Sequence, residues 1–113
     1  MEVKEIIVFA KDNGREPFTE WLQELADVEA QKRIRLRLYM LKRGNAGDCK
    51  SLGDGVFELR FQFGPGYRVY FGQEGPMIVI LLCGGDKRSQ ARDVRQAKQF
   101  WETHKAWKKR KPT

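Results

Sequence analysis

The chain has 113 residues, of which 41% are hydrophobic, and this is enough apolar material for the core of one small domain spanning residues 1–113. With two cysteines, no CxxC pair and one histidine, a zinc site is disfavoured, and we expect no metal and no cofactor. No apolar run is long enough to span a bilayer and the N-terminus lacks a signal-peptide core, so we expect a cytoplasmic protein without membrane contact.

The net charge of +7 is unevenly distributed along the chain. Residues 1–30 contain 3 basic and 8 acidic residues, so the remaining residues carry a net charge of +12. This polarity predicts a polyanionic partner for the basic part, and nucleic acid is the leading candidate. The alternative is a basic surface that is merely solvated.

The first elements are a strand and a helix. Residues 5–9 are mostly apolar and predict a short strand, and residues 11–14 predict a turn. Pro17 suits the first turn of a helix. The core-facing side chains of that helix recur at helical spacing and are Phe18, Trp21, Leu22 and Leu25.

A second, longer helix is predicted from about Glu29 to Arg43, and it forms a hairpin with the first. Its apolar stripe consists of Ile34, Leu38 and Leu41. Basic residues line a different face and are candidate contacts to RNA or the ribosome, although most such faces are only solvated. These candidates are Lys32, Arg35, Lys42 and Arg43.

After a polar connector at residues 45–55, residues 56–87 predict three antiparallel strands. The turns between them are expected at residues 63–66 and 72–76, where Gly and Pro supply the backbone geometry. The first two strands alternate, and the third is apolar throughout, which predicts a central position covered on both faces. Alternation places these apolar side chains on the core face: Phe57, Leu59, Phe61, Phe63, Tyr67, Val69 and Phe71.

The same alternation predicts an anion site on the other face. If the first two strands pair through the short Gly-Pro turn, Arg60 and Arg68 lie together on the non-core face. The run Gly84-Gly85-Asp86-Lys87 then adds a cation at the end of the third strand.

A last helix is predicted after Ser89, which suits the N-cap position. Its stripe is predicted to contain Ala91, Val94, Ala97 or Lys98, and Trp101, and the basic residues from about 105 to 113 are expected to form a flexible tail. The order β-α-α-β-β-β-α predicts an α+β fold. We expect a twisted antiparallel sheet with the helical hairpin on one face and the other face partly open, plus the C-terminal helix.

In the order and spacing of three short motifs, the chain resembles the RelE/ParE toxin superfamily, and most closely its HigB-like, phage-related branch of addiction-module killer proteins. The resemblance implies a RelE-like microfold and a bacterial toxin neutralised by an antitoxin, here expected to be of the helix-turn-helix, HigA-like type. Toxins of the RelE and HigB type cut mRNA in the ribosome, whereas ParE relatives inhibit DNA gyrase. The motifs are Glu58-Leu59-Arg60, Gly66-Tyr67-Arg68-Val69-Tyr70, and Gly85-Asp86-Lys87 with Ser89-Gln90.

By the resemblance, Arg68 matches the arginine that binds the scissile phosphate, Arg60 matches a basic position on the neighbouring strand, and Lys87 or Arg88 matches a basic residue after the last strand. The chain departs from the pattern at Glu58, where such toxins often have lysine. It also has Arg92-Asp93-Val94 where they often have a tyrosine, and its one histidine, His104, lies far downstream.

Metal-free RNA cleavage requires a proton acceptor for the 2′-hydroxyl, stabilisation of charge on the phosphate, and a proton donor for the leaving 5′-oxygen. We assign charge stabilisation to Arg68 with Arg60 in support, because guanidinium groups bind phosphate bidentately. Lys87 is the first candidate for proton transfer. Other candidates, for proton transfer or base stacking, are Glu58, Tyr70, Lys50 and Asp86.

Structural alternatives stand beside these assignments: Glu58 as an ion-pair partner of an arginine, Asp86 as a turn cap, and His104 as a surface residue. We therefore expect an mRNA endoribonuclease (an mRNA interferase) that inhibits translation, with the ribosome, mRNA and an antitoxin as partners. A gyrase inhibitor and a non-catalytic nucleic-acid-binding module are the alternatives.

Overall fold

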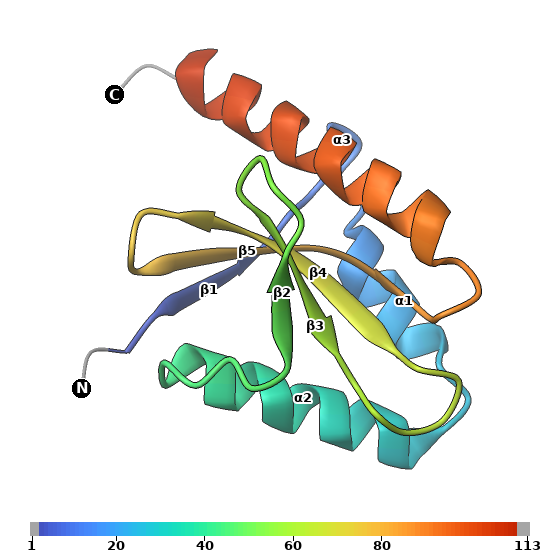
Figure 1. Cartoon of the computed structure of the whole chain (residues 1–113). Helices are drawn as coiled ribbons and strands as arrows, with labels where there is room; N and C mark the ends of the chain where they lie inside the picture. The colour runs from blue at the N-terminus through green and yellow to red at the C-terminus, as the bar shows by residue number, and fades with distance from the viewer. Residues whose placement is uncertain (1–2, 111–113) are drawn as a thin grey trace.

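The computed structural model describes residues 3–110 and places a five-stranded sheet between helices on both sides (Figure 1). The fold is α+β, with the expected order of elements and one additional strand. No helix in residues 3–110 is both long enough and apolar enough to cross a membrane. The elements are β1 (Glu5–Val8), α1 (Pro17–Glu24), α2 (Val28–Lys42), β2 (Cys49–Ser51), β3 (Val56–Arg60), β4 (Arg68–Glu74), β5 (Ile78–Gly85) and α3 (Gln90–Arg110).

The strand order in the sheet is β1-β5-β4-β3-β2, so β5 is central, as its continuous apolar sequence predicts. The three contacts among β2, β3, β4 and β5 are antiparallel, but β1 pairs with β5 in parallel. The expectation of a wholly antiparallel sheet was therefore wrong for β1. No turn joins β1 to β5, because the chain between them runs through α1, α2, β2, β3 and β4, and so long a connection allows parallel pairing.

Strand β2 was not predicted, because residues 45–55 were expected to form a connector without a strand. It has only 3 residues, which is too short to show alternation. Its pairing with β3, in which Lys50 lies opposite Glu58, extends the sheet by one edge strand.

Helices α1 and α2 cover one face of the sheet (Figure 1). Pro17 occupies the start of α1, and the Asp27 side chain caps α2 by accepting a hydrogen bond of 3.2 Å from the amide of Ala30. The predicted apolar stripes are confirmed, and they pack on the predicted core face of β3 and β4. The buried residues of this layer are Phe18, Leu22, Ala30, Ile34, Leu41, Leu59, Phe61, Tyr67, Val69, Phe71, Val79 and Leu81.

Helix α3 packs on the opposite face, and the part of that face around Arg60 stays open beside it, as expected (Figure 1). At 21 residues, α3 is long enough to cross the sheet, and its stripe of Val94, Ala97 and Trp101 packs there. Ala91, predicted on this stripe, is exposed. The buried residues of this second layer are Phe9, Val56, Tyr70, Ile80, Leu82, Cys83, Ala97 and Trp101.

The turn between β4 and β5 begins later than predicted. Strand β4 continues through Gly72 to Glu74, and the reversal is centred on Gly75, which has a φ of 60°. Gly72 lies beneath the ring of Trp101, and a Cβ atom at this position would overlap that ring. The glycine therefore serves close packing between α3 and the sheet rather than a turn.

Replacing Gly72 with alanine is expected to destabilise the fold by about 1–3 kcal/mol, because Trp101 is buried and cannot move away without loss of packing. Urea denaturation of Gly72→Ala and of Gly75→Ala provides the measurement and its control. A Cβ atom at Gly75 would meet no atom within 4 Å, so that variant has only the backbone strain of a positive φ, about 1 kcal/mol. Equal losses in the two variants would show that the Trp101 contact does not limit position 72.

The last two turns of α3 replace most of the predicted flexible tail, since residues 105–110 are helical. Glu74 at the end of β4 holds this part of the helix, with His104 Nε2 at 2.8 Å and Lys108 Nζ at 3.4 Å from its carboxylate. His104, expected as a surface histidine of the last helix, is half-buried there and stacks on Trp101 at a centroid distance of 5.5 Å. Lys111 and the rest of the predicted tail lie outside the described residues.

Glu74 makes stability depend on acid pH. Burial works to raise the pKa of its carboxyl group, but the contacts with His104 and Lys108 outweigh burial and hold the pKa below its usual value. The stability that the Glu74 contacts add to the fold is fully present above the ordinary glutamate pKa of about 4.3. It is lost as the pH falls through the lowered pKa of Glu74. In urea denaturation from pH 6 downward, Glu74→Gln should lose less stability in acid than the wild type. The exposed Glu24→Gln variant should follow the wild type, and identical curves for Glu74→Gln would contradict this role.

Candidate phosphate-binding cleft

Arg60, Arg68 and Lys87 line one open cleft of about 350 Å³. The register explains how they meet: Arg60 lies directly opposite Arg68, and Arg68 lies opposite Gly85 at the end of β5. The prediction that both arginines share the non-core face is therefore confirmed. The remaining lining residues come from the β3–β4 turn and are Phe61, Gln62, Gly64, Pro65 and Gly66.

The segment from Asp86 to Ser89 holds Lys87 at the rim of this cleft. The Asp86 carboxylate accepts hydrogen bonds from the amides of Arg88 at 2.9 Å and Ser89 at 3.2 Å, which confirms its prediction as a turn cap. The Lys87 amide donates to the carbonyl of Pro65 at 3.3 Å. Gly66, with a φ of 77°, allows this approach, since a Cβ atom there would lie 3.2 Å from Lys87 Cβ.

A buried carboxylate lies beneath the same segment and was not predicted. Asp93 is 3% exposed, and the hydroxyl of Ser89 donates to its carboxylate. Gly85 is required beside it, because a Cβ atom at Gly85 would overlap the carboxylate. In the sequence, an aspartate in the first turn of a helix indicates only a favourable contact with the helix dipole, so burial of Asp93 has no sequence signal.

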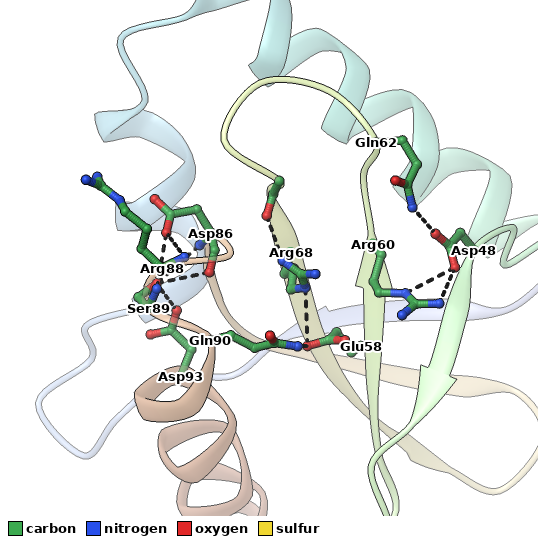
Figure 2. A network of polar contacts seen from close by, with 11 residues as sticks. Asp48, Glu58, Arg60, Gln62, Arg68, Asp86, Arg88, Ser89, Gln90 and Asp93 are labelled. Carbon is green, nitrogen blue, oxygen red and sulfur yellow. Dashed lines mark hydrogen bonds and ion pairs between the residues drawn. The ribbon is translucent and has the colours of Figure 1, made fainter.

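Arg68 is the most constrained of the three cations. Its side chain is 13% exposed, its Nε lies 3.6 Å from Glu58 Oε2, and its Nη1 donates to the carbonyl of Gly66 at 3.0 Å (Figure 2). A guanidinium group has five N–H donors, so these contacts fix the plane of the group and leave donors for a ligand in the cleft. Arg68 is thus pre-organised to bind an anion.

Glu58 anchors Arg68 from below. Its side chain is 0% exposed, and Gln90 at the start of α3 donates a hydrogen bond of 2.9 Å to its Oε2. Within residues 3–110, Glu58 Oε1 has no hydrogen-bond partner. Because the carboxylate is buried, it cannot reach a substrate in the cleft, and the geometry favours the ion-pair interpretation over that of a general base.

Tyr70 is 0% exposed in the layer under α3, which agrees with the alternative that it packs on its strand neighbours and leaves no ring face for stacking on a base. The first two strands alternate as predicted, but α3 covers the face on which Tyr70 lies. Burial, and then the negative charge of Glu58, raise the pKa of the Tyr70 hydroxyl. The hydroxyl therefore stays protonated at neutral pH and does not act as a base.

Arg60 is paired with Asp48, which the sequence did not indicate as a site residue. Arg60 Nε and Nη2 donate to Asp48 Oδ1 at 3.2 and 3.0 Å, and Gln62 donates to Oδ2 at 2.6 Å (Figure 2). Hydrogen bonds from Gln62 and Arg60 lower the pKa of the Asp48 carboxyl group. Arg37 on α2 braces the same corner through a hydrogen bond of 2.9 Å to the carbonyl of Arg60. Arg60 therefore adds positive charge to the cleft, while its guanidinium group is already hydrogen-bonded to Asp48.

The other predicted site residues, for proton transfer or for contact with RNA or the ribosome, do not line this cleft. Lys50 is exposed on edge strand β2, and Arg88 lines a neighbouring cleft. The candidates on α2 and at its C-cap are exposed, but α2 packs against the opposite face of the sheet from Arg60 and Arg68. These candidates are Lys32, Arg35, Lys42 and Arg43.

Chemically, the cleft can bind an anion with Arg68 and move a proton with Lys87, the exposed titratable group at its rim. Cys83 is buried, and burial together with the charge of Asp93 raises the pKa of its thiol to about 12, so it is not a nucleophile at neutral pH. In residues 3–110, no three His, Cys, Asp or Glu side chains are grouped so that they could hold a metal ion.

A protein of Haemophilus influenzae, named only "Uncharacterized protein", is 49% identical over 81 residues, which are 72% of this chain and 82% of that protein. No protein-family model matches the chain.

Proposed function

We propose that this chain, which belongs to the same family as the Haemophilus influenzae protein, is a ribosome-dependent endoribonuclease that cuts mRNA and is the toxin of a toxin–antitoxin pair. The observation that carries the proposal is the meeting of Arg60, Arg68 and Lys87 in one cleft, with Arg68 fixed by Glu58. The resemblance of the motifs around Arg60, Arg68 and Asp86 to RelE-like and HigB-like toxins supports the same activity.

In the proposed reaction, the 2′-oxygen of the RNA attacks the adjacent phosphorus and the bond from phosphorus to the 5′-oxygen breaks. The 2′-hydroxyl loses its proton and the leaving 5′-oxygen gains one, so the products end in a 2′,3′-cyclic phosphate and a 5′-hydroxyl. Arg68 stabilises the charge that develops on the phosphoryl oxygens, with Arg60 adding positive charge beside it. Lys87, at the rim of the cleft, accepts the proton of the 2′-hydroxyl and passes a proton to the leaving 5′-oxygen.

The proposed partners follow from the resemblance and from charge. The ribosome presents mRNA, and a helix-turn-helix, HigA-like antitoxin holds the toxin inactive. The excess of positive charge after residue 30 favours association with ribosomal RNA through counterion release.

One observation favours a second candidate, an inhibitor of DNA gyrase of the ParE type. Of the acid–base candidates, Glu58 and Tyr70 are buried, and only Lys87 lines the cleft. Cleavage that uses one side chain to take a proton and another to donate one would need two such groups in the cleft. The cleft exposes one, and this favours binding without cleavage.

The two candidates are separated by adding purified protein to an in-vitro translation reaction and, in parallel, to a gyrase supercoiling reaction. We expect mRNA to be cut in the first reaction and supercoiling to proceed unchanged in the second. Intact mRNA together with inhibited supercoiling would replace the proposal with the second candidate.

A further inference from the structure

A second cleft of about 730 Å³ lies on the other side of the segment from Asp86 to Ser89. Trp21 from α1 and the glycines at the end of β5 contribute its apolar part. A Cβ atom at Gly84 would overlap the ring of Trp21, so this ring lies directly on the backbone of β5 and gives the cleft a rigid wall. The lining residues are Trp21, Gly84, Gly85, Asp86, Arg88, Ser89, Ala91, Arg92 and Arg95.

This cleft is strongly basic. Arg88, Arg92 and Arg95 follow one another at spacings of four and three residues, so Arg92 and Arg95 share a face of α3 just beyond Arg88. The Arg92 side chain is 74% exposed, and its Nε lies 3.6 Å from Asp93 Oδ1. Asp86 is the one acidic residue of the lining, and its carboxylate already accepts two backbone hydrogen bonds. The amino-terminal end of α3, a helix of 21 residues, adds a partial positive charge at the same place.

The second cleft adjoins the first. Arg68, which lines the first cleft, is the direct cross-strand partner of Gly85, which lines the second. Lys87 and Arg88 are consecutive residues and line the first and second clefts respectively. Figure 2 shows Arg88 pointing away from Arg60, on the far side of Arg68. The cations therefore form a continuous path from the β3–β4 turn to the second turn of α3.

We propose that the second cleft binds the single-stranded RNA that flanks the phosphate held by Arg68, with Arg88, Arg92 and Arg95 as contacts to successive phosphates. This inference rests on the proposed function and names the path of its substrate. Single-stranded RNA fits better than a lone anion because three arginines are spread along the wall of a cleft twice the volume of the first. It also differs from the expectation that α2 carries the RNA contacts, since α2 lies on the opposite face of the sheet.

The test measures binding of a fluorescent single-stranded RNA oligonucleotide with 2′-O-methyl groups throughout, which lacks the nucleophile for cleavage. We measure the affinity of this RNA between about 50 and 200 mM salt. The proteins compared are the wild type, the α3 double variant Arg92→Gln/Arg95→Gln and the control Arg35→Gln/Arg43→Gln. Both double variants remove two exposed arginines, so they change the net charge equally. For single strands each phosphate contact contributes about −0.7 to the slope of log affinity against log salt.

We expect the α3 double variant to bind more weakly than the wild type, with a slope shallower by about 1.4, and the α2 control to retain the wild-type slope. The inference is overturned if the α3 variant keeps the wild-type slope, if the α2 control loses as much, or if the wild type binds no RNA. It is also overturned if a polyglutamate peptide of equal charge displaces the RNA, since the cleft would then be a general anion surface. Because the probe cannot be cut, loss of cleavage in a separate assay would contradict the proposed activity without changing this result.

Discussion

The variant Glu58→Gln/Arg68→Met is expected to cut mRNA in a translation reaction about 10²–10³-fold more slowly than Glu58→Gln alone, because it removes the donor that stabilises the developing phosphoryl charge. Both proteins carry glutamine at position 58, so the difference between their cleavage rates measures the effect of removing the Arg68 guanidinium group. Methionine fills a similar volume without charge, and the amide that Glu58→Gln introduces keeps an oxygen that can accept from Gln90.

The matched control for this experiment is Glu58→Gln/Arg43→Met, which removes an exposed arginine at the C-cap of α2, away from the cleft. We expect it to cleave mRNA at the rate of Glu58→Gln. A folded Glu58→Gln/Arg68→Met protein that cuts at an unchanged rate would remove Arg68 from the mechanism, and equal losses in both variants would show a general effect of charge.

Arg68→Met alone is expected to destabilise the fold by about 3–5 kcal/mol, because it leaves the buried Glu58 carboxylate without its cation. That loss is a large fraction of the stability of a small domain, about 5–15 kcal/mol. For this reason a simple Arg68→Ala test of activity would confuse unfolding with loss of catalysis. Adding Glu58→Gln should recover about 2 kcal/mol of the loss, since it removes the unpaired charge.

Urea denaturation of the two single variants and the double variant gives the coupling between positions 58 and 68. We expect the double variant to be clearly more stable than the sum of the single losses predicts. Additive losses would mean that the 3.6 Å contact between Arg68 Nε and Glu58 Oε2 contributes nothing to stability.

Much of the fold could be predicted from periodicity. Alternation in residues 57–71 placed Leu59 and Val69 on the core face and Arg60 with Arg68 on the other, and the register confirms this. The two glycines of the β3–β4 turn, Gly64 and Gly66, both have positive φ, so glycine was an accurate turn signal there. At Gly72 the same signal misled, because a glycine that makes room for Trp101 has the same sequence signature as a turn.

The remaining features of the fold depend on contacts between distant segments. Strand β2 is stable only beside β3, and β1 becomes parallel only by pairing with β5, so neither has a local signature. Residues 105–110 looked too charged to pack, but Glu74 from β4 pairs with His104 and Lys108 and extends α3 past them. The helical conformation of this charged stretch therefore depends on Glu74, which precedes His104 by 30 residues in the sequence.

For the site, the sequence indicated which cations gather but not how each is held. Cross-strand pairing was enough to bring Arg60 and Arg68 together, and the strand end brought Lys87. Burial of Glu58 and Tyr70 depends on α3 lying across that face, which the sequence order left open. The pairing of Arg60 with Asp48 depends on unpredicted strand β2, and the arginine-lined second cleft depends on where α3 begins.

The most direct test of the central claim is the chemistry of the mRNA ends produced in a translation reaction by the wild-type protein. The account predicts new upstream fragments that end in a 2′,3′-cyclic phosphate and downstream fragments that begin with a 5′-hydroxyl. A single 2′-deoxynucleotide at the cut position should abolish the cut there. Translation that stops while the mRNA stays intact, or ends carrying a 5′-phosphate, would contradict the claim that the Arg68 cleft supports attack by the 2′-hydroxyl.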